Sequence, residues 1–261
     1  MAARPVFSVL IPARLSSSRL PRKPLLDIAG LPMVVRCCQC AQASGASTVA
    51  VATDSQEIVD VVQAHGFTAL LTAEQHATGT DRLAEAATLL GLNEEDIVVN
   101  LQGDEPLMSA DLLRRVAERL ATRPDAVMAT VVHPIHDLAS FMNPAVVKVV
   151  VNAQGDAQWF SRAPIPWPRD AFNQAPFVWP LINPPLRHVG LYAYRRHFLP
   201  TYAALPAPVT EQAESLEQLR VLHHGYILSC VQVEEAPEGG VDTADDLARV
   251  RLQIDLLGAV R

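Results

Sequence analysis

The chain has 261 residues, 49% of them hydrophobic and 19% charged, which is enough apolar material for a sizeable core in one large domain or two coupled ones. A formal net charge of −7 argues against general binding to nucleic acids or to membrane surfaces. No apolar run approaches the roughly 20 residues of a membrane span, and the short run before Pro12 does not fit a signal peptide, so we expect a cytoplasmic protein without stable membrane association.

The first half of the chain alternates strand and helix patterns. The predicted strands cover residues 6–11, 48–52, 67–71 and 97–101. The predicted helices cover residues 32–43, 55–64, 80–90 and 109–121. Ser55 is the expected N-cap of the second helix. Such alternation predicts an α/β protein with a mostly parallel sheet flanked by helices, and a Rossmann-like region over residues 1–125.

The pattern changes after residue 125. The strands predicted there cover residues 126–132, 145–151, 157–160, 187–194 and 226–233. Seven of the 20 prolines fall within 164–185, so we expect this segment to be irregular and without helix. Two helices are predicted after it, over about 210–222 and from about residue 242. Region 126–261 is expected to be a mixed-sheet extension with a dimer contact, whose C-terminal helices pack back to give one compact domain.

A basic loop follows the first predicted strand. It contains Arg14, Arg19, Arg22 and Lys23 and no acidic residue. A loop at the carboxyl end of a strand is where α/β sheets bind ligands. Fixed cations there suit a polyanion such as a triphosphate. The alternative is a solvated basic loop, but three prolines stiffen this one and lower the cost of holding its cations together.

An acidic pair follows the strand predicted over 97–101. Asp104 and Glu105 come directly after it, so a parallel sheet would bring them to the same edge as the basic loop. Carboxylate oxygens there suit Mg²⁺ that bridges phosphate oxygens. The alternative is an ordinary β-turn in which glycine and aspartate have their usual roles.

Two other loops at this edge are ambiguous. The segment 78–82 enters a helix and either wraps a base or ribose or serves only as an N-cap. Asp54, after the second strand, has the same two interpretations. Neither the Gly-x-Gly-x-x-Gly dinucleotide fingerprint nor the Gly-x-x-x-x-Gly-Lys phosphate loop is present, so a phosphate contact has to come from the basic loop.

Cysteine and histidine patterns indicate no zinc site. The cysteines are Cys37, Cys38, Cys40 and Cys230. The single C-x-x-C pair has no second pair, so we interpret these cysteines as small helix residues in a reducing cytoplasm. His133 and His136 have no companion ligands.

The second half offers polar residues that each have an ordinary alternative. Arg162 lies beside a rigid proline turn. His188 and Tyr192 fall in one predicted strand, where a single histidine is often a satisfied core residue. Glu217 and Gln218 lie on a predicted helix and would ordinarily face solvent.

Eight motifs occur together in one order. They are 12–24 (PARLSSSRLPRKP), 52–54 (ATD), 79–82 (GTDR), 100–106 (NLQGDEP), 161–166 (SRAPIP), 187–192 (RHVGLY), 216–220 (LEQLR) and 240–243 (GVDT). From about Phe7 to Arg251 the chain resembles the 3-deoxy-manno-octulosonate cytidylyltransferases, the CMP-Kdo synthetases. The first motif alone would indicate only a sugar-nucleotidyltransferase fold.

The resemblance implies a nucleotidyltransferase that uses CTP, Kdo (3-deoxy-D-manno-octulosonate) and Mg²⁺. The anomeric hydroxyl of Kdo would attack the α-phosphorus of CTP in line, giving CMP-Kdo for lipopolysaccharide synthesis and releasing pyrophosphate. Such a transfer depends mainly on positioning and charge neutralisation. Region 1–125 would then bind CTP, and region 126–261 would bind the sugar and form a homodimer.

The family's functional residues carry over by motif. The implied catalytic residues are Arg14, Lys23 and Asp104. The implied nucleotide-binding residues are Pro12, Ala13, Arg14, Arg19, Lys23, Thr53, Asp54, Thr78, Gly79, Thr80, Arg82 and Gln102. The implied sugar-binding residues are Arg162, His188, Tyr192, Glu217 and Gln218. The implied Mg²⁺ ligands are Asp104 and Asp242.

Three features depart from the family pattern or fit two roles. Arg22 stands where the family often has glycine, and Ala73 replaces a common arginine. The proline-rich stretch 174–185 matches no motif. Asp242 suits the N-cap of the last predicted helix as well as it suits a metal site.

Three other functions remain open at this point. One is a cytidylyltransferase for another acidic sugar, such as sialic acid. Another is a glycosyltransferase that uses a nucleotide sugar, although such enzymes usually have Asp-x-Asp where this chain has Asp104-Glu105. The third is a non-catalytic nucleotide-binding regulator, which the paired basic and acidic loops argue against.

Overall fold

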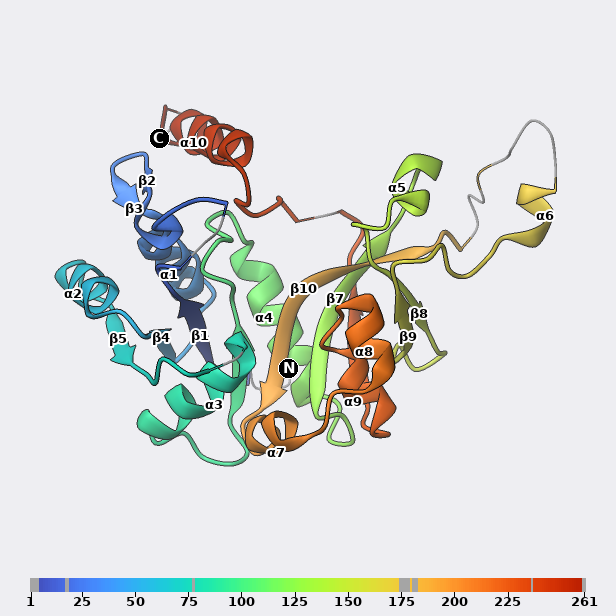
Figure 1. Cartoon of the computed structure of the whole chain (residues 1–261), viewed down its shortest axis with the longest axis horizontal. Helices are drawn as coiled ribbons and strands as arrows, with labels where there is room; N and C mark the ends of the chain where they lie inside the picture. The colour runs from blue at the N-terminus through green and yellow to red at the C-terminus, as the bar shows by residue number, and fades with distance from the viewer. Residues whose placement is uncertain are drawn as a thin grey trace.

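Nine strands of the described chain form one mixed sheet (Figure 1). The computed structural model describes residues 5–16, 19–76, 78–173, 179, 183–235 and 237–259, with side chains up to residue 256. The strands are β1 (Phe7–Ala13), β4 (Thr48–Thr53), β5 (Thr68–Leu71), β6 (Ile97–Asn100), β7 (Met128–Pro134), β8 (Lys148–Val151), β9 (Ala157–Ser161), β10 (Leu186–Arg195) and β11 (Leu228–Gln232). Their order is β11-β7-β10-β6-β1-β4-β5, with β8 paired to β10 and β9 paired to β8.

The direction of the strands divides the sheet. β5, β4, β1 and β6 are parallel, as the alternation of strands and helices predicts. β10 is antiparallel to both β6 and β7, and β11 is parallel to β7. Because β10 reverses the direction, the carboxyl ends of β1, β4, β6 and β7 share one edge with the amino end of β10. The Rossmann-like fold class is confirmed, and the second half extends the same sheet.

Helices cover both faces of the sheet. One buried cluster packs α1 (Met33–Ala43), α2 (Gln56–Ala64) and α4 (Ala110–Ala121) on one face. A second cluster packs α3 (Gly79–Leu89), α7 (Phe198–Ala204) and α9 (Leu219–His223) on the other. β1 is buried along almost its whole length because it lies between the two layers. No helix in the described residues is long and apolar enough to cross a membrane.

Two helix starts have the caps that their sequences favour. The hydroxyl of Ser55 accepts a hydrogen bond from the backbone N–H of Ile58, which confirms Ser55 as the N-cap of α2. Thr78 and Asp81 form a reciprocal capping box at the start of α3. The segment 78–82 therefore has a structural role whether or not it also contacts a ligand.

The single helix predicted over 210–222 is wrong. The segment forms α8 (Val209–Glu214) and α9, because Ser215 between them is left-handed with a φ of 51°. The guanidinium of Arg162 donates to the carbonyls of Glu214 and Ser215. A side chain from the end of β9 thus takes the acceptors that a continuing helix would have used.

Asp242 is not the N-cap of the last helix. α10 (Ala244–Ala259) follows Thr243, whose hydroxyl accepts a hydrogen bond from the N–H of Asp246 at 3.2 Å. The carboxylate of Asp246 accepts in return from the N–H of Thr243. Thr243 and Asp246 therefore form the cap, and the side chain of Asp242 is left to face the basic loop.

Short elements also escaped prediction. They are η1 (Lys23–Leu25), the hairpin of β2 (Asp27–Ile28) and β3 (Leu31–Pro32), α5 (Leu138–Met142), α6 (Arg169–Phe172) and α7. The single turn of α6 contradicts the expectation that the proline-rich segment has no helix. Most of the stretch 174–185 lies outside the described residues.

The C-terminal segment crosses the molecule to reach the first half. Val241 donates its N–H to the carbonyl of Asp104 at 2.9 Å. Its side chain is fully buried with Ile28, Met33 and Val250. α10 consequently lies beside β2, β3 and α1 (Figure 1). This anchoring brings residue 242 to the sheet edge at which the basic loop lies.

Candidate active site

Two adjoining cavities open at the carboxyl edge of the parallel strands. The smaller has a volume of about 120 Å³ and is lined by Pro12, Ala13, Arg14, His76, Thr78, Gly79, Arg82 and Gln102. The larger, of about 310 Å³, is lined by Pro12, Ala13, Arg14, Ser16, Arg19, Lys23, Pro24, Gln102, Gly103 and Asp104. The basic loop, the loop after β6 and the start of α3 thus meet at one place.

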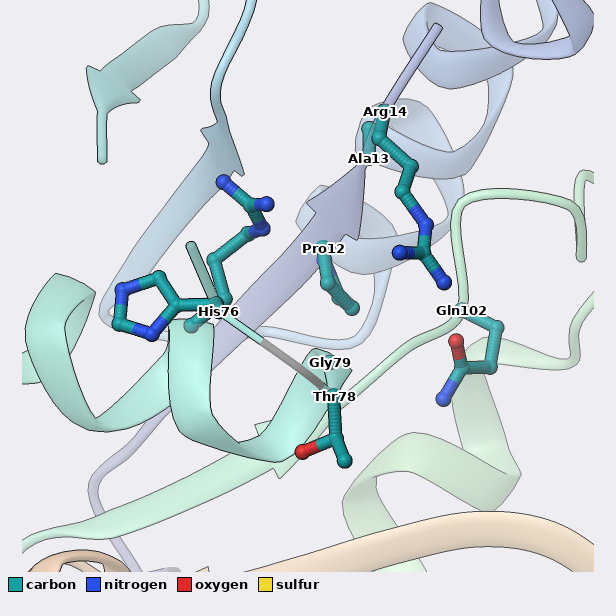
Figure 2. Close-up of a pocket in the computed structure, with 8 residues that line it drawn as sticks. Pro12, Ala13, Arg14, His76, Thr78, Gly79 and Gln102 are labelled. Atoms are coloured by element: carbon teal, nitrogen blue, oxygen red, sulfur yellow. The ribbon is translucent and has the colours of Figure 1, made fainter. Parts of the chain in front are cut away.

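The smaller cavity lies between two groups of side chains. Figure 2 shows Arg14 and Gln102 on one side and His76, Thr78 and Gly79 on the other. Nε2 of His76, which the sequence did not single out, is hydrogen-bonded to the carboxylate of Glu85 in α3. That contact lowers the pKa of Glu85. No motif in the sequence includes His76, and its contact with Glu85 becomes visible only in the folded chain.

Three predicted nucleotide-binding residues form hydrogen bonds with other groups of the protein. Arg82 is buried and donates to the carboxylate of Asp54 at 2.7 Å and to the hydroxyl of Thr72 at 2.6 Å. Thr53 is buried and accepts a hydrogen bond from the N–H of Ser55. The Arg82–Asp54 pair therefore fixes the start of α3 against the end of β4, beside the smaller cavity that Arg82 lines.

The larger cavity contains a network of opposite charges. The ammonium of Lys23 lies 2.6 Å from the carboxylate of Asp104 and 3.0 Å from that of Asp242. Arg19 also pairs with Asp242, at 3.0 Å. Burial opposes the charged form of Lys23, but Asp104 and Asp242 outweigh it, so the pKa of Lys23 is raised. The structure therefore brings the predicted triphosphate cations and the predicted metal ligands together.

Arg22 does not belong to this network. It pairs with Glu57 of α2 and lines neither cavity. Its φ of 56° is in the left-handed region, which glycine adopts at no steric cost. This conformation explains why glycine suits the position, and the Glu57 pair shows that the additional charge of Arg22 is directed away from the cavity.

Glu105 adjoins the acidic side of the network. Burial, together with the charges of Asp104 and Asp242, raises the pKa of Glu105 to about 7. A Cβ at Gly240 would lie 2.8 Å from the Glu105 carboxylate and 3.0 Å from the Asp104 carbonyl. Glycine at residue 240 therefore lets the C-terminal segment lie this close to the loop after β6 without displacing Glu105.

The paired carboxylates fit a magnesium ion. Asp104 and Asp242 both reach one cationic atom, the Nζ of Lys23, so they could both reach a small cation in its place. Mg²⁺ is usually bound by one or two carboxylates, with waters and substrate phosphates as its other ligands. No group of three or more His, Cys, Asp or Glu side chains in the described ranges could hold a metal. The substrate would have to complete the coordination.

The histidine of β10 is a neutral ring. Its Nε2 lies 3.0 Å from the Thr130 hydroxyl, which also lies within hydrogen-bond distance of the Val189 and Leu191 carbonyls. Burial lowers the pKa of His188 to about 3. An uncharged imidazole can donate one hydrogen bond and accept another, but it cannot attract a carboxylate by charge.

Arg162 is partly committed to the protein. Its guanidinium donates to the carbonyls of Glu214 at 2.6 Å, Pro144 at 3.0 Å and Ser215 at 3.5 Å. A guanidinium has five N–H groups, so these bonds leave N–H groups for a ligand. Arg162 can still donate to a carboxylate, but it also joins the end of β9 to the segments that contain Pro144 and Glu214.

A row of polar groups connects the two cavities with β10. The Tyr194 hydroxyl bonds with Thr80 and Asn100, and Tyr192 lies next to Tyr194 with ring centroids 6.0 Å apart. The Asn100 Oδ1 and the Gln218 Nε2 are buried without a partner among the described residues. Unpaired buried polar atoms are costly, so they indicate a polar ligand or ordered water here.

Asn100 was not among the predicted site residues. Its signal in the sequence is a polar side chain at the end of an otherwise apolar strand, two residues before Gln102. Glu217 is exposed beside this region, and its carbonyl accepts from the Tyr202 hydroxyl at 3.3 Å. Tyr192 of β10 and the segment that leads into α9 therefore pack on the face of the sheet that also carries α3.

The cysteines take no part in this chemistry. All four are free, and burial raises the pKa of Cys38 to about 12 and that of Cys40 to about 11. The Cys40 thiol donates to the carbonyl of Pro106. A thiol with a raised pKa is a poor nucleophile, so the C-x-x-C pair acts as packing between α1 and the loop after β6.

Comparison with known proteins agrees with this geometry. Residues 8–232 match the cytidylyltransferase family. A solved structure similar to the chain is that of a CMP:2-keto-3-deoxy-manno-octonic acid synthetase complexed with CTP. The two share 42% sequence identity with a TM-score of 0.86, and the match covers 96% of this chain and 99% of the other.

We predict that Lys23→Met will bind Mg²⁺ more tightly than the wild type when no nucleotide is present. The substitution removes the ammonium that both carboxylates hold and leaves two like charges that favour a cation. Calorimetric titration with MgCl₂ should give a dissociation constant lower by about tenfold. Arg14→Met is the matched control, because Arg14 lines both cavities but pairs with no carboxylate in the described residues. Unchanged or weaker Mg²⁺ binding by Lys23→Met would contradict the assignment.

Proposed function

The chain belongs to the cytidylyltransferase family, and from this premise we propose that it joins CTP to Kdo, forming CMP-Kdo and releasing pyrophosphate. The family match covers most of the chain, and the similar synthetase was solved with CTP bound. The observation that carries the proposal is the meeting of Arg14, Arg19 and Lys23 with Asp104 at the carboxyl edge of the sheet. That edge is where a triphosphate and its metal ion need opposite charges side by side.

We assign the nucleotide to the two adjoining cavities. Thr78, Gly79 and Thr80 lie at the start of α3 and would contact the cytidine. The cations of the larger cavity would hold the β- and γ-phosphates and neutralise charge on the leaving pyrophosphate. Mg²⁺, held by Asp104 and Asp242, would supply a Lewis acid at the phosphate oxygens. Catalysis in this scheme is positioning and charge neutralisation, without a covalent enzyme intermediate.

We assign the sugar to the adjoining surface of β10 and α9. The remaining N–H groups of Arg162 can receive the Kdo carboxylate. His188, Tyr192, Glu217 and Gln218 offer hydrogen-bonding groups to the sugar hydroxyls, and the unpaired Gln218 amide supports this. His188 would act there as a neutral hydrogen-bonding group.

The direct test of this function is pyrophosphate release. With CTP, Mg²⁺ and Kdo the purified protein should release pyrophosphate and form CMP-Kdo. Sialic acid in place of Kdo should give no more release than CTP alone. Asp104→Asn should lower kcat by at least about tenfold, since an amide lacks the charge that holds a hard cation. Turnover with sialic acid but not Kdo would instead assign the chain to a related sugar.

We also propose a homodimer built by the second half. β9 pairs only with β8 in the described sheet, so one of its edges is open. A groove of about 390 Å³ lies nearby, lined by Val149, Val150, Val151, Pro166, Asn183, Pro184, Pro185, Leu186 and Gln232. Trp159 is 39% exposed and Trp167 is 56% exposed. A second copy is the occupant that would cover these apolar groups together.

Light scattering at micromolar concentration should give a mass close to that of two chains. A mass near the 28.3 kDa of a single chain would contradict the dimer.

The four free cysteines support a reducing compartment, the cytoplasm, where CTP is also available. Cell fractionation that found the chain in an oxidising compartment would contradict this location.

A further inference from the structure

Lys148 is a fully buried ammonium in the second half of the sheet. It has 0% exposure, and none of the ion pairs in the described structure includes it. Its Nζ donates to the carbonyls of Val146 and Arg162 at 2.6 Å and of Asn143 at 3.0 Å. An ammonium has three donors, so all of them are used by backbone.

Lys148 is on β8, which lies between β9, the strand that leads into Arg162, and β10, the strand that carries His188 and Tyr192. In the β8–β9 pairing its Cα is opposite Ser161, which precedes Arg162. In the β10–β8 pairing it is opposite Arg187, which precedes His188. Lys148 is thus on the middle one of three neighbouring strands, and its ammonium holds the carbonyl of Arg162.

The connection continues from Arg162 to α9. Glu214 accepts hydrogen bonds from the Ser161 hydroxyl and from the Arg162 N–H, both at 2.6 Å. The Arg162 guanidinium binds the carbonyls of Glu214 and Ser215, where the left-handed turn begins that leads to Glu217. The same guanidinium binds Pro144, next to the Asn143 carbonyl that Lys148 holds.

The burial of this charge is costly. An ion taken out of water without an ion-pair partner costs several kcal/mol, and an apolar side chain of similar size is often as stable or more so. Burial lowers the pKa of Lys148, while the nearby Glu214 opposes that shift. Stability therefore gives a weak reason for a lysine here, whereas three directed hydrogen bonds to two loops give a strong one.

We propose that Lys148 is a positioning residue for the sugar pocket, which holds Arg162 and the 214–218 turn in the geometry that receives the acidic sugar. Lys148 touches no substrate and acts through the Arg162 backbone. The proposal rests on the proposed function, because it assumes that Arg162, Glu217 and Gln218 line the sugar site. It predicts a defect in the use of the sugar but not of CTP.

The test compares Lys148→Met with Arg123→Met. Arg123 pairs with the buried Asp156 before the start of β9, at the opposite end of that strand from Arg162, so its loss removes a comparable set of hydrogen bonds at the far end of the strand. Lys148→Met should raise the KM for Kdo by about tenfold and leave the KM for CTP within about twofold. Arg123→Met should lower thermal stability while both KM values stay at those of the wild type.

Hydrogen exchange supplies a readout that does not depend on turnover. Backbone amides of residues 160–163 and 211–220, which lie away from Asp156, should exchange faster in Lys148→Met than in Arg123→Met. Equal exchange in these segments, or equal changes of both KM values, would overturn the proposal. If Lys148→Met does not fold, Ser161→Ala removes the hydroxyl bond to Glu214 and the bond that the hydroxyl accepts from the Ala163 N–H, and it should still raise the KM for Kdo selectively.

The two proposals fail in different ways. If the wild type does not use Kdo, the proposed function fails, and the exchange data still decide whether Lys148 orders the 214–218 turn. If the wild type uses Kdo and Lys148→Met has an unchanged KM for it, the positioning role alone is wrong.

Discussion

The bridge that Lys23 forms between Asp104 and Asp242 is the interaction on which the site depends. Two cations or two carboxylates this close together would repel one another if they were unpaired. The pairing of Arg19 and Lys23 with Asp104 and Asp242 neutralises both sets and keeps the loops at the sheet edge together. In the proposed function, the phosphates of CTP would replace the carboxylates beside Lys23 and Arg19, and Mg²⁺ would replace the ammonium beside Asp104 and Asp242, so both have to bind for every charge to keep a partner.

Backbone packing makes this pairing possible. A Cβ at Gly103 would lie 2.9 Å from the Pro12 carbonyl, so the loop after β6 approaches the end of β1 as closely as glycine permits. Gly240 has the same role toward Asp104 and Glu105 from the C-terminal side. Val241 then anchors the C-terminal segment in a small apolar cluster. The positions of the charged groups at this edge therefore depend on two glycines and an apolar cluster.

Sequence patterns predicted what local periodicity and parallel topology determine. The alternation of the first half gave the sheet, and the carboxyl ends of β1 and β6 had to bring Lys23 and Asp104 to one edge. The contact with Asp242, 219 positions after Lys23, could not be predicted from local pattern, since it depends on where Val241 is buried. The break at Ser215 was likewise hidden, because a distant arginine stabilises it.

The central claim is that metal and nucleotide replace the Lys23 bridge together. Titration of CTP into the wild-type protein, once with Mg²⁺ and once with a chelator, tests it most directly. The account predicts that CTP binds at least about tenfold more tightly with Mg²⁺, since Asp104 and Asp242 otherwise keep Lys23 from the phosphates. Equal CTP affinity in the two titrations would contradict it.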